Sequence, residues 1–185
     1  MHKALLIGDF HIPTRARDIP PRIRSKVEEE AYDLVLCTGD LVSPKVLNWL
    51  RSLSSQVFIV RGNMDYLSLP KWQEVTMELL RIGLTHGDEV YPRGDIEQLT
   101  SIAMRRGVDI LVHGHTHVLS VDLIERGRRI LLLNPGSATG VWSGSGGSLV
   151  PSFMLLIVEG GRATVHSYEL KGDVLAHDSK VFQIK

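Results

Sequence analysis

Five short polar motifs follow apolar runs of the sequence, and each brings carboxylate, amide or imidazole groups to the end of its run. The motifs are Asp9-Phe10-His11, Gly39-Asp40, Gly62-Asn63, His86-Gly87-Asp88 and the segment from His113 to His117. Each apolar run is short and continuous, which is typical of a buried strand. Because ligands bind beyond the carboxyl ends of strands in open α/β sheets, we expect the motifs to form one polar site.

Seven side chains of these motifs offer oxygen or nitrogen atoms that bind metal ions. They are Asp9, His11, Asp40, Asn63, His86, His115 and His117. Seven ligands are too many for one tetrahedral ion and suit two ions that share a bridging ligand. Mixed imidazole and carboxylate ligands favour manganese, nickel, zinc, iron or cobalt, whereas calcium and magnesium prefer oxygen alone. We therefore predict a site for two divalent metal ions, with manganese favoured.

Two such ions, roughly 3.5–4 Å apart, promote in-line displacement at phosphorus. They lower the pKa of a bridging water, so that hydroxide forms near neutral pH and attacks the phosphorus atom. A protein nucleophile is not evident, because Cys37 lies within an apolar run and no serine occupies a nucleophile-elbow pattern. The motifs therefore predict a metal-dependent phosphoesterase that uses a metal-bridging hydroxide.

The order of the motifs resembles that of the calcineurin-like metallophosphoesterases: Asp-x-His, Gly-Asp, Gly-Asn, a lone His and Gly-His-x-His. This resemblance covers nearly the whole chain, from Asp9 to at least residues 151–153. The short length and the segment from Asn134 to Ser137 resemble the small single-domain phosphodiesterases of that family. The resemblance implies phosphodiester substrates and an α/β fold in which two packed β-sheets lie between helices, as α-β-β-α layers.

The resemblance also implies how the ligands divide between the two ions. One ion would be held by Asp9, His11 and His117, the other by Asn63, His86 and His115, and Asp40 would bridge both. A bridging carboxylate makes physical sense, because it screens two dications that would repel at close range. The catalytic residues are expected to be Asp40, Asn63 and His115.

One position departs from the pattern of many family members, which carry histidine directly after Gly-Asn. Here that position is Met64, which cannot donate a proton to a leaving group. We therefore expect weaker catalysis for substrates with poor leaving groups. The small phosphodiesterases also tend to lack this histidine, so the change is compatible with activity.

Three segments look like the phosphoesterase-fold subunit of the eukaryotic retromer coat, which is chiefly a scaffold. They are residues 8–13, 36–39 and 134–140. The alternative function is therefore a protein-interaction scaffold with a retained metal site, and a protein partner is compatible with this alternative. Unlike the scaffold branch, this chain keeps Asp40, and a scaffold has no physical need for seven metal ligands. We favour the enzyme.

Other polar residues near the motifs have structural interpretations. We expect His113 to be packed or hydrogen-bonded within the fold, and Arg15 to be a solvated surface charge. Asp65 and Asp88 could either orient a ligating histidine or close a turn, and the sequence leaves both interpretations open.

The first half of the chain predicts a βαβαβ unit, whose strands are expected to be parallel. Its strands are predicted over residues 3–8, 33–38 and 56–61, and its helices over 21–31 and 43–53. A hairpin around Arg81, a helix over 95–106 opened by Asp95 and Gln98, and a strand over 109–113 follow.

Beyond residue 117 the chain reads mostly as strands. They are predicted over residues 118–125, 129–133, 153–159, 162–170 and 174–184, with an irregular loop over 136–148. We expect a sandwich in which the first sheet is more parallel and the second more antiparallel.

The composition bounds the class of protein. A length of 185 residues fits one domain, and we predict a single metallophosphoesterase domain over residues 1–185. Lys plus Arg equals Asp plus Glu, at 21 each, which argues weakly against a nucleic-acid-binding module. The motifs and the family resemblance make a small-molecule phosphoester the expected substrate. No apolar run approaches the ~20 residues of a membrane span, and no signal peptide is evident, so we expect a cytoplasmic protein. A homo-oligomer through a sheet edge or helix face is compatible with the sequence.

Overall fold

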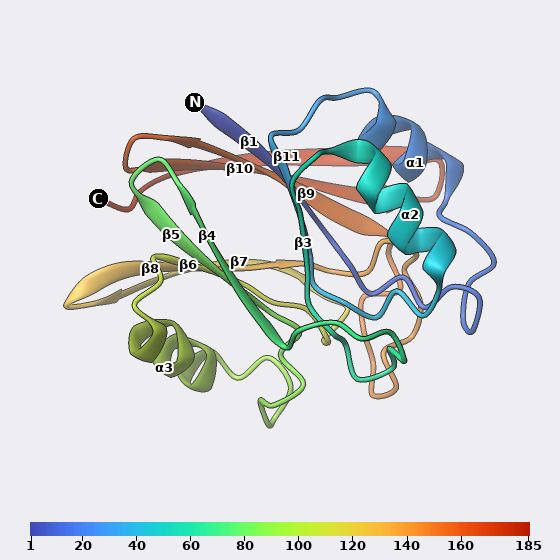
Figure 1. Ribbon diagram of the computed structural model, residues 1–185, viewed down its shortest axis with the longest axis horizontal. Helices are drawn as coiled ribbons and strands as arrows, with labels where there is room; N and C mark the ends of the chain where they lie inside the picture. The colour runs from blue at the N-terminus through green and yellow to red at the C-terminus, as the bar shows by residue number, and fades with distance from the viewer.

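The computed structural model describes all 185 residues as two β-sheets and three α-helices (Figure 1). In spatial order, the six-stranded sheet consists of β11 (Val174–Gln183), β10 (Arg162–Lys171), β9 (Ser152–Glu159), β1 (His2–Ile7), β2 (Leu34–Cys37) and β3 (Val57–Ile59). The five-stranded sheet consists of β4 (Trp72–Met77), β5 (Leu80–Thr85), β6 (Ile110–Val112), β8 (Arg128–Pro135) and β7 (Leu119–Arg126). The helices are α1 (Pro21–Glu28), α2 (Pro44–Leu53) and α3 (Ile96–Arg106).

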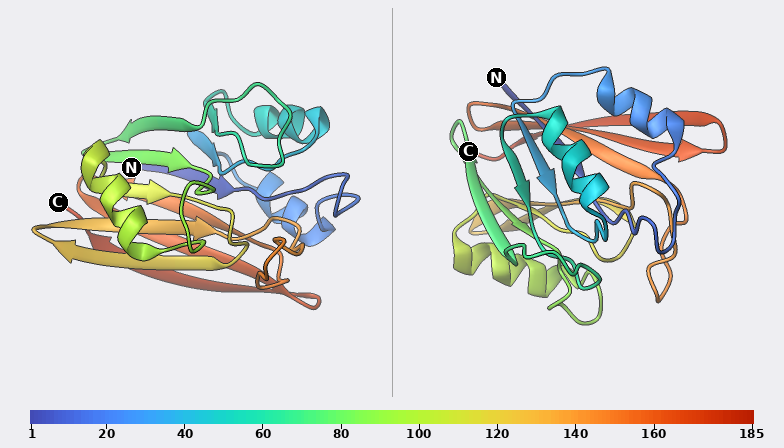
Figure 2. Two further views of the ribbon diagram at one scale, coloured as in Figure 1. Left: turned by 90° about the horizontal axis from the view of Figure 1, so that it is seen from below. Right: turned by 45° about the vertical axis from the view of Figure 1, so that its right-hand side comes forward.

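The two sheets pack face to face, with α1 and α2 on the outer face of the six-stranded sheet and α3 on the outer face of the other (Figure 1, Figure 2). These α-β-β-α layers confirm the predicted fold class. None of the three helices is both long and apolar enough to cross a membrane.

Strand β1 shows why the continuous apolar runs form central strands. Successive side chains of a strand point to opposite faces of the sheet, so both faces of β1 must be covered. Ala4 and Leu6 belong to the core between the sheets, whereas Leu5 and Ile7 pack in the core beneath α1 and α2. All four are fully buried. The same double burial fixes the register of β1 and hence the place where Asp9 follows it.

The two sheets do not divide into a parallel and an antiparallel one, so that prediction was wrong. The strands β1, β2 and β3 are parallel, but β9 pairs antiparallel with the other edge of β1 and carries β10 and β11 into the same sheet. In the second sheet β5, β6 and β8 are parallel, and β4 and β7 are antiparallel edge strands. The late hairpins complete open edges of both sheets rather than forming a sheet of their own.

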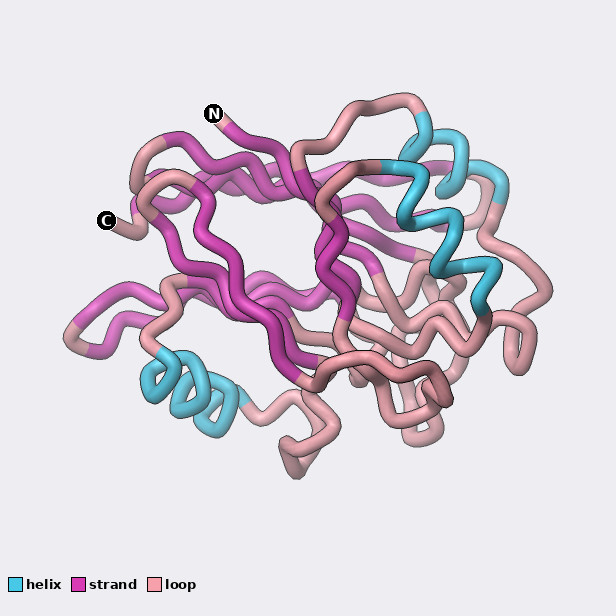
Figure 3. The backbone as a smooth tube through the Cα atoms, in the orientation of Figure 1, coloured by secondary structure: helices cyan, strands magenta, loops and turns pink.

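Most predicted elements lie within a few residues of their expected bounds. The hairpin turn falls at Glu78 and Leu79, so Arg81 lies inside β5 and not at the turn. Asp95 caps α3 as predicted, because its side chain accepts a hydrogen bond of 2.9 Å from the Gln98 main-chain N–H. Loops gather at the lower right of Figure 3, where β1, β2, β3, β5 and β6 end. The five sequence motifs lie in these loops.

Candidate metal centre

The backbone of the motif loops is strained where the predicted ligands lie. Five of the seven predicted ligands have left-handed φ angles: 50° at Asp9, 48° at His11, 51° at Asp40, 70° at His115 and 56° at His117. Such a conformation costs a non-glycine residue roughly 1–3 kcal/mol and persists only where the surrounding structure enforces it. Its repetition at five candidate ligands indicates a functional requirement at this edge of the sheets.

The first candidate ligand set is Asp9, His11 and His117, whose side chains are at most 2% exposed. The Nε2 atoms of His11 and His117 are 3.1 Å apart, and His117 Nε2 lies 3.3 Å from Asp9 Oδ1. One ligand atom from each residue falls within 4.8 Å of the others, which is the spacing expected around one ion. The structure therefore brings this predicted set together.

Asp40 lies between the two ligand sets. Its Oδ2 atom is 3.3 Å from His11 Nε2 and 3.5 Å from His86 Nε2. Its other oxygen, Oδ1, accepts a hydrogen bond of 2.8 Å from the Met64 main-chain N–H. Oδ1 of Asp40 is thus held by the main chain, and Oδ2 lies between the two ligand sets.

The second candidate set is arranged around His86. Its Nε2 atom lies 3.1 Å from Asn63 Oδ1 and 3.2 Å from His115 Nδ1. His86 is buried and Asn63 is exposed, so this set is reachable from solvent on the side of Asn63. Asp9 and Asp40 also come within 4.8 Å of His86, which ties the two sets into one cluster.

Main-chain carbonyls fix the orientation of two of these imidazole rings. His86 Nδ1 lies 2.8 Å from Thr38 O, and His117 Nδ1 lies 2.7 Å from Val141 O. A carbonyl oxygen only accepts hydrogen bonds, so each Nδ1 donates and a neutral ring keeps its lone pair on Nε2. Those Nε2 atoms then face acceptor oxygens, and the buried Asp9 Oδ1 has no hydrogen-bond donor. Convergent lone pairs beside an orphaned carboxylate oxygen fit a divalent cation.

The pKa values of the cluster reflect these crowded, buried groups. Burial is the main factor that raises the pKa of Asp40 to about 6, and the neighbouring charge of Asp9 acts in the same direction. Burial also lowers the pKa of His11 and of His115 to about 4, so both rings are neutral at pH 7, as metal ligands must be. Burial opposes the charge on His117, but the nearby Asp9 carboxylate, 3.3 Å from its Nε2 atom, outweighs burial and raises that pKa.

Residues 3–160 match the family model of the calcineurin-like phosphoesterase superfamily domain. The chain belongs to this superfamily. The "Probable metallophosphoesterase" of Methanocaldococcus jannaschii is 40% identical over 134 residues, which cover 72% of this chain and 67% of that protein. The family is metal-dependent, and the clustered histidines and carboxylates of this member agree with that property.

Two solved structures of Vps29, the retromer subunit, are also similar to this phosphoesterase-family chain. Vps29 of Entamoeba histolytica in complex with zinc is 34% identical, with a TM-score of 0.87 over 97% of this chain and 98% of that chain. Vps29 of Chaetomium thermophilum in complex with a cyclic peptide is 31% identical, with a TM-score of 0.82 over 100% of this chain and 98% of that chain. Both resemblances drawn from the motifs, to the family and to the coat subunit, are confirmed.

Asp65, whose role the sequence left open, anchors the motif loops of this family member. Its carboxylate accepts hydrogen bonds from the main-chain N–H groups of Asp40 and Val42, each at 2.8 Å, and from that of Gly62 at 2.9 Å. A Cβ atom at Gly62 would collide with the Asp40 carboxylate, which explains the glycine of the Gly-Asn motif. Asp65 is therefore a positioning residue, whereas Asp88 is exposed and has no such contacts.

The remaining site residues show what the motifs could and could not indicate. His113 is buried and its Nδ1 lies 3.3 Å from Asn134 Nδ2, which confirms a packed histidine. Ser137 donates to the Asp9 carbonyl at 2.7 Å, a contact that the Asn134–Ser137 motif could have suggested. The carbonyls of Thr38 and Val141 left no signal in the sequence, because any residue type carries a carbonyl.

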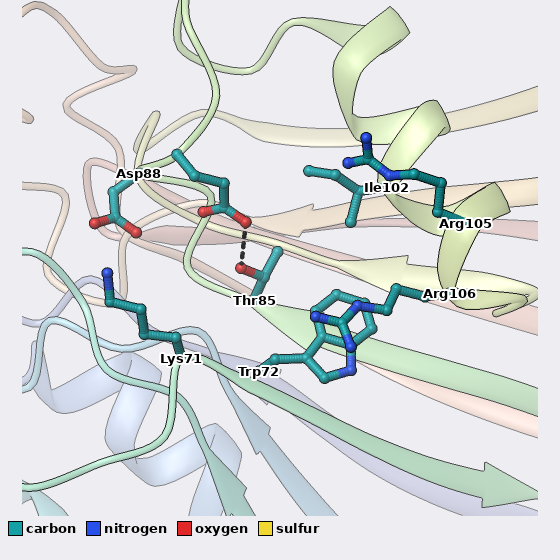
Figure 4. A pocket seen from close by; sticks show the side chains of 8 residues that line it. Lys71, Trp72, Thr85, Asp88, Ile102, Arg105 and Arg106 are labelled. Atoms are coloured by element: carbon teal, nitrogen blue, oxygen red, sulfur yellow. Dashed lines mark hydrogen bonds between the residues drawn. The ribbon is translucent and has the colours of Figure 1, made fainter.

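A separate cavity of about 280 Å³ lies between β4, β5 and α3 (Figure 4). Its wall carries charges of both signs: Lys71, Arg105, Arg106, Asp88 and Glu89. The Arg106 guanidinium lies 4.7 Å from the Trp72 ring centre, and Glu89 accepts from the Thr85 hydroxyl at 3.0 Å. None of the candidate ligands lines this cavity, so it is not part of the metal centre.

Proposed function

We propose that this protein is a dinuclear metal-dependent phosphoesterase that acts on phosphodiesters. The observation that best supports the proposal is the convergence of imidazole lone pairs on a buried carboxylate oxygen that lacks a donor, in a chain of the calcineurin-like superfamily. A scaffold gains nothing from such an arrangement without a cation, because a buried unpaired carboxylate costs folding free energy.

The proposed centre uses the two ligand sets that the family resemblance implies. Asp9, His11 and His117 would hold one ion, Asn63, His86 and His115 the other, and Asp40 would bridge them. When bound, two such ions supply an activated water and neutralise phosphate oxygens as charge develops on them. Manganese is our favoured ion, although the zinc complex of the Entamoeba relative makes zinc the first alternative to test.

The protein's own groups orient the reacting partners. The Met64 N–H holds Asp40 Oδ1 and leaves Oδ2 facing both ligand sets. Asn63 turns Oδ1 toward His86, so its exposed NH₂ group can donate to a phosphate oxygen of the substrate. The His115 main-chain N–H donates to Asp9 Oδ2 at 3.1 Å and links the two sets.

The Met64 side chain restricts the substrates that suit this site. It is 43% exposed beside Asn63 and offers no proton to a departing oxygen. Esters with good leaving groups need no such proton. We therefore propose that diesters of acidic alcohols or phenols are hydrolysed faster than alkyl diesters.

The proposal is tested by assaying the Mn²⁺-loaded protein on bis(4-nitrophenyl) phosphate. We expect Asp40→Asn and His117→Ala to lower kcat/KM by about 100-fold or more, because each removes a metal ligand. The matched control is Asp173→Asn, which changes an exposed aspartate in the turn between β10 and β11. Equal rates for the wild type and both ligand variants would refute the proposal.

A scaffold role is the second candidate, and exposed apolar residues favour it. Side chains that are 43–86% exposed lie in the loops around the metal centre: Met64, Tyr66, Tyr91, Val118, Trp142 and Leu149. A contiguous exposed apolar patch marks an interaction site, and of these residues Tyr91 and Val118 line one hollow together. The Chaetomium relative is known in complex with a cyclic peptide. Affinity purification with the wild type and Tyr91→Asp tests this role, since a genuine partner would be lost only with the variant.

A further inference from the structure

A loop over residues 141–148 joins the metal centre to two arginines. Three consecutive main-chain carbonyls of this loop accept hydrogen bonds from distant side chains. They are Val141 O, from His117 Nδ1 at 2.7 Å, Trp142 O, from Arg15 Nη1 at 2.7 Å, and Ser143 O, from Arg93 Nη1 at 2.9 Å. We expected Arg15 to be a solvated charge; it is half-buried, and its guanidinium also donates an exposed hydrogen bond to a carbonyl 127 residues away.

Neither guanidinium is neutralised by the protein. No carboxylate lies within 4.0 Å of Arg15 or Arg93, and each is held instead by a neutral carbonyl. Arginine stays protonated at any physiological pH, and its fork of donors matches the oxygens of phosphate or carboxylate. Arg93 is bound through Nη1 alone, so its remaining donors are available to a ligand.

The hollow beside Arg93 holds no acid, and its lining combines polar groups with Tyr91, Pro92 and Val118. Its volume is about 570 Å³. The groups that could contact a ligand come from Arg93, Thr116, Ser143, Ser145 and Gly147, and no Asp or Glu is among the lining residues. The cavity of Figure 4 differs, because Asp88 and Glu89 offset its cations. An anion in the hollow would therefore meet no like charge from the lining, whereas in that cavity it would meet two carboxylates.

Glycine N–H groups of the loop add further donors. The main-chain N–H groups of Gly144, Gly146 and Gly147 have no acceptor within the protein, whereas those of Ser143 and Ser145 are used inside the loop. The three glycines have φ angles of 101°, 127° and 111°, which side-chain-bearing residues rarely adopt. Gly147 lines the hollow, and Gly144 adjoins Arg93, because a Cβ atom there would lie 3.7 Å from Arg93 Nη2. Free N–H groups in such a turn suit an anion.

The hollow adjoins the metal centre through chain neighbours of two candidate ligands, although no candidate ligand lines the hollow itself. Thr116, which lines it, stands between the candidate ligands His115 and His117. A Cβ atom at Gly147 would lie 3.2 Å from the Cβ of His117, and the Ser148 N–H donates to the His117 carbonyl at 3.1 Å. A ligand whose phosphorus lies at the metal centre could thus extend a second group into the hollow.

We propose that this hollow is an anion subsite, in which Arg93 and the loop glycines bind a phosphate or carboxylate group that the substrate carries beside its scissile phosphodiester. Its role in substrate choice rests on the proposed phosphodiesterase function. The substrate class is then a phosphodiester with a second anionic group, and Arg93 is a specificity-determining residue.

Binding is tested by titrating inorganic phosphate, and separately acetate, into ¹⁵N-labelled protein supplied with Zn²⁺. Saturable shifts of the Gly144, Gly146 and Gly147 amide resonances are expected in the wild type. The anion affinity of Arg93→Gln should be lower than that of the wild type by roughly tenfold or more. The control Arg17→Gln, an exposed arginine of another loop, should match the wild type. Loop shifts that are absent, or equally strong in Arg93→Gln, would overturn the proposal. The tighter of the two anions identifies the chemistry of the second group.

Substrate choice is tested with three 4-nitrophenyl phosphodiesters whose other ester group is methyl, carboxymethyl or 2-phosphoethyl. All three release the same phenolate, so kcat/KM differences report on the second group. We expect the wild type to have a higher kcat/KM for an anionic ester than for the methyl ester. In Arg93→Gln the kcat/KM for that anionic ester should fall roughly tenfold, while the kcat/KM for the methyl ester stays unchanged. Turnover of the methyl ester without any preference would overturn the subsite alone, whereas turnover of none would refute the proposed function.

Discussion

The carboxylate of Asp65 accepts a hydrogen bond of 2.8 Å from the main-chain N–H of Asp40, the residue proposed to bridge the two ions. The same carboxylate holds two further N–H groups, so it fixes the strained backbone from which Asp40 projects. The geometry of the candidate metal centre therefore depends on a residue outside the proposed ligand sets.

Replacing Asp65 with alanine should destabilise the protein and weaken metal binding together. The change leaves three buried N–H groups without an acceptor, and we expect the free energy of unfolding to fall by about 3–5 kcal/mol. Urea unfolding with and without Zn²⁺ measures both effects. Asp173→Ala serves as the exposed control, and a Zn²⁺ affinity unchanged in Asp65→Ala would contradict the positioning role.

Metal binding should raise the melting temperature of the wild type. Ions that bind only the folded state stabilise it by mass action, so Tm should increase with Mn²⁺ or Zn²⁺ concentration and fall again with a chelator. Asp9→Asn should abolish most of this shift, because it removes the buried carboxylate of the first ligand set. A Tm response as large in Asp9→Asn as in the wild type would place the ions elsewhere.

Acidification should lower the free energy of unfolding, because His113 is buried as a neutral ring. Burial lowers its pKa from 6.5 to about 4. Between pH 6.5 and 4, His113 is therefore protonated in the unfolded chain but stays neutral in the folded protein. Stability is therefore lost as pH falls from 6.5 to 4, by up to roughly 3 kcal/mol for this residue. The measurement is the difference in unfolding free energy between wild type and His113→Gln across that range. A difference that does not vary with pH would contradict the shifted pKa.

Restoring histidine at position 64 should improve catalysis selectively. Met64 is half-exposed, so Met64→His creates no cavity, and the new imidazole can protonate a departing oxygen. We expect kcat/KM to rise by about tenfold or more for an alkyl diester and to change little for bis(4-nitrophenyl) phosphate. Met64→Gln, which adds polarity without a comparable proton donor, is the matched control. An equal effect on both substrates would argue against a leaving-group role.

The convergence of the candidate ligands was easier to predict from the sequence than the arrangement of the sheets. Asp9, Asp40 and His86 follow central strands whose two buried faces leave little freedom of register, so their convergence could be anticipated. Pairing of β9 with β1 could not be anticipated, because many apolar strands could have covered that edge.

Contacts between distant parts of the chain explain what was missed at the site. Arg15 looked like a surface charge because its partner, the Trp142 carbonyl, carries no mark in the sequence. Asp65 remained open because its role appears only when Asp40, Val42 and Gly62 are brought around it. Side-chain types predicted the chemistry, and main-chain partners that hold those side chains had to come from the structure.

The central claim, that Asp40 bridges two metal ions, is tested most directly by anomalous diffraction from crystals of the wild type grown with Mn²⁺. We predict two anomalous peaks, roughly 3.5–4 Å apart, on either side of Asp40 Oδ2. One peak should lie beside Asp9 and His117, and the other beside Asn63 and His86. A single peak, or peaks away from Asp40, would contradict the dinuclear centre.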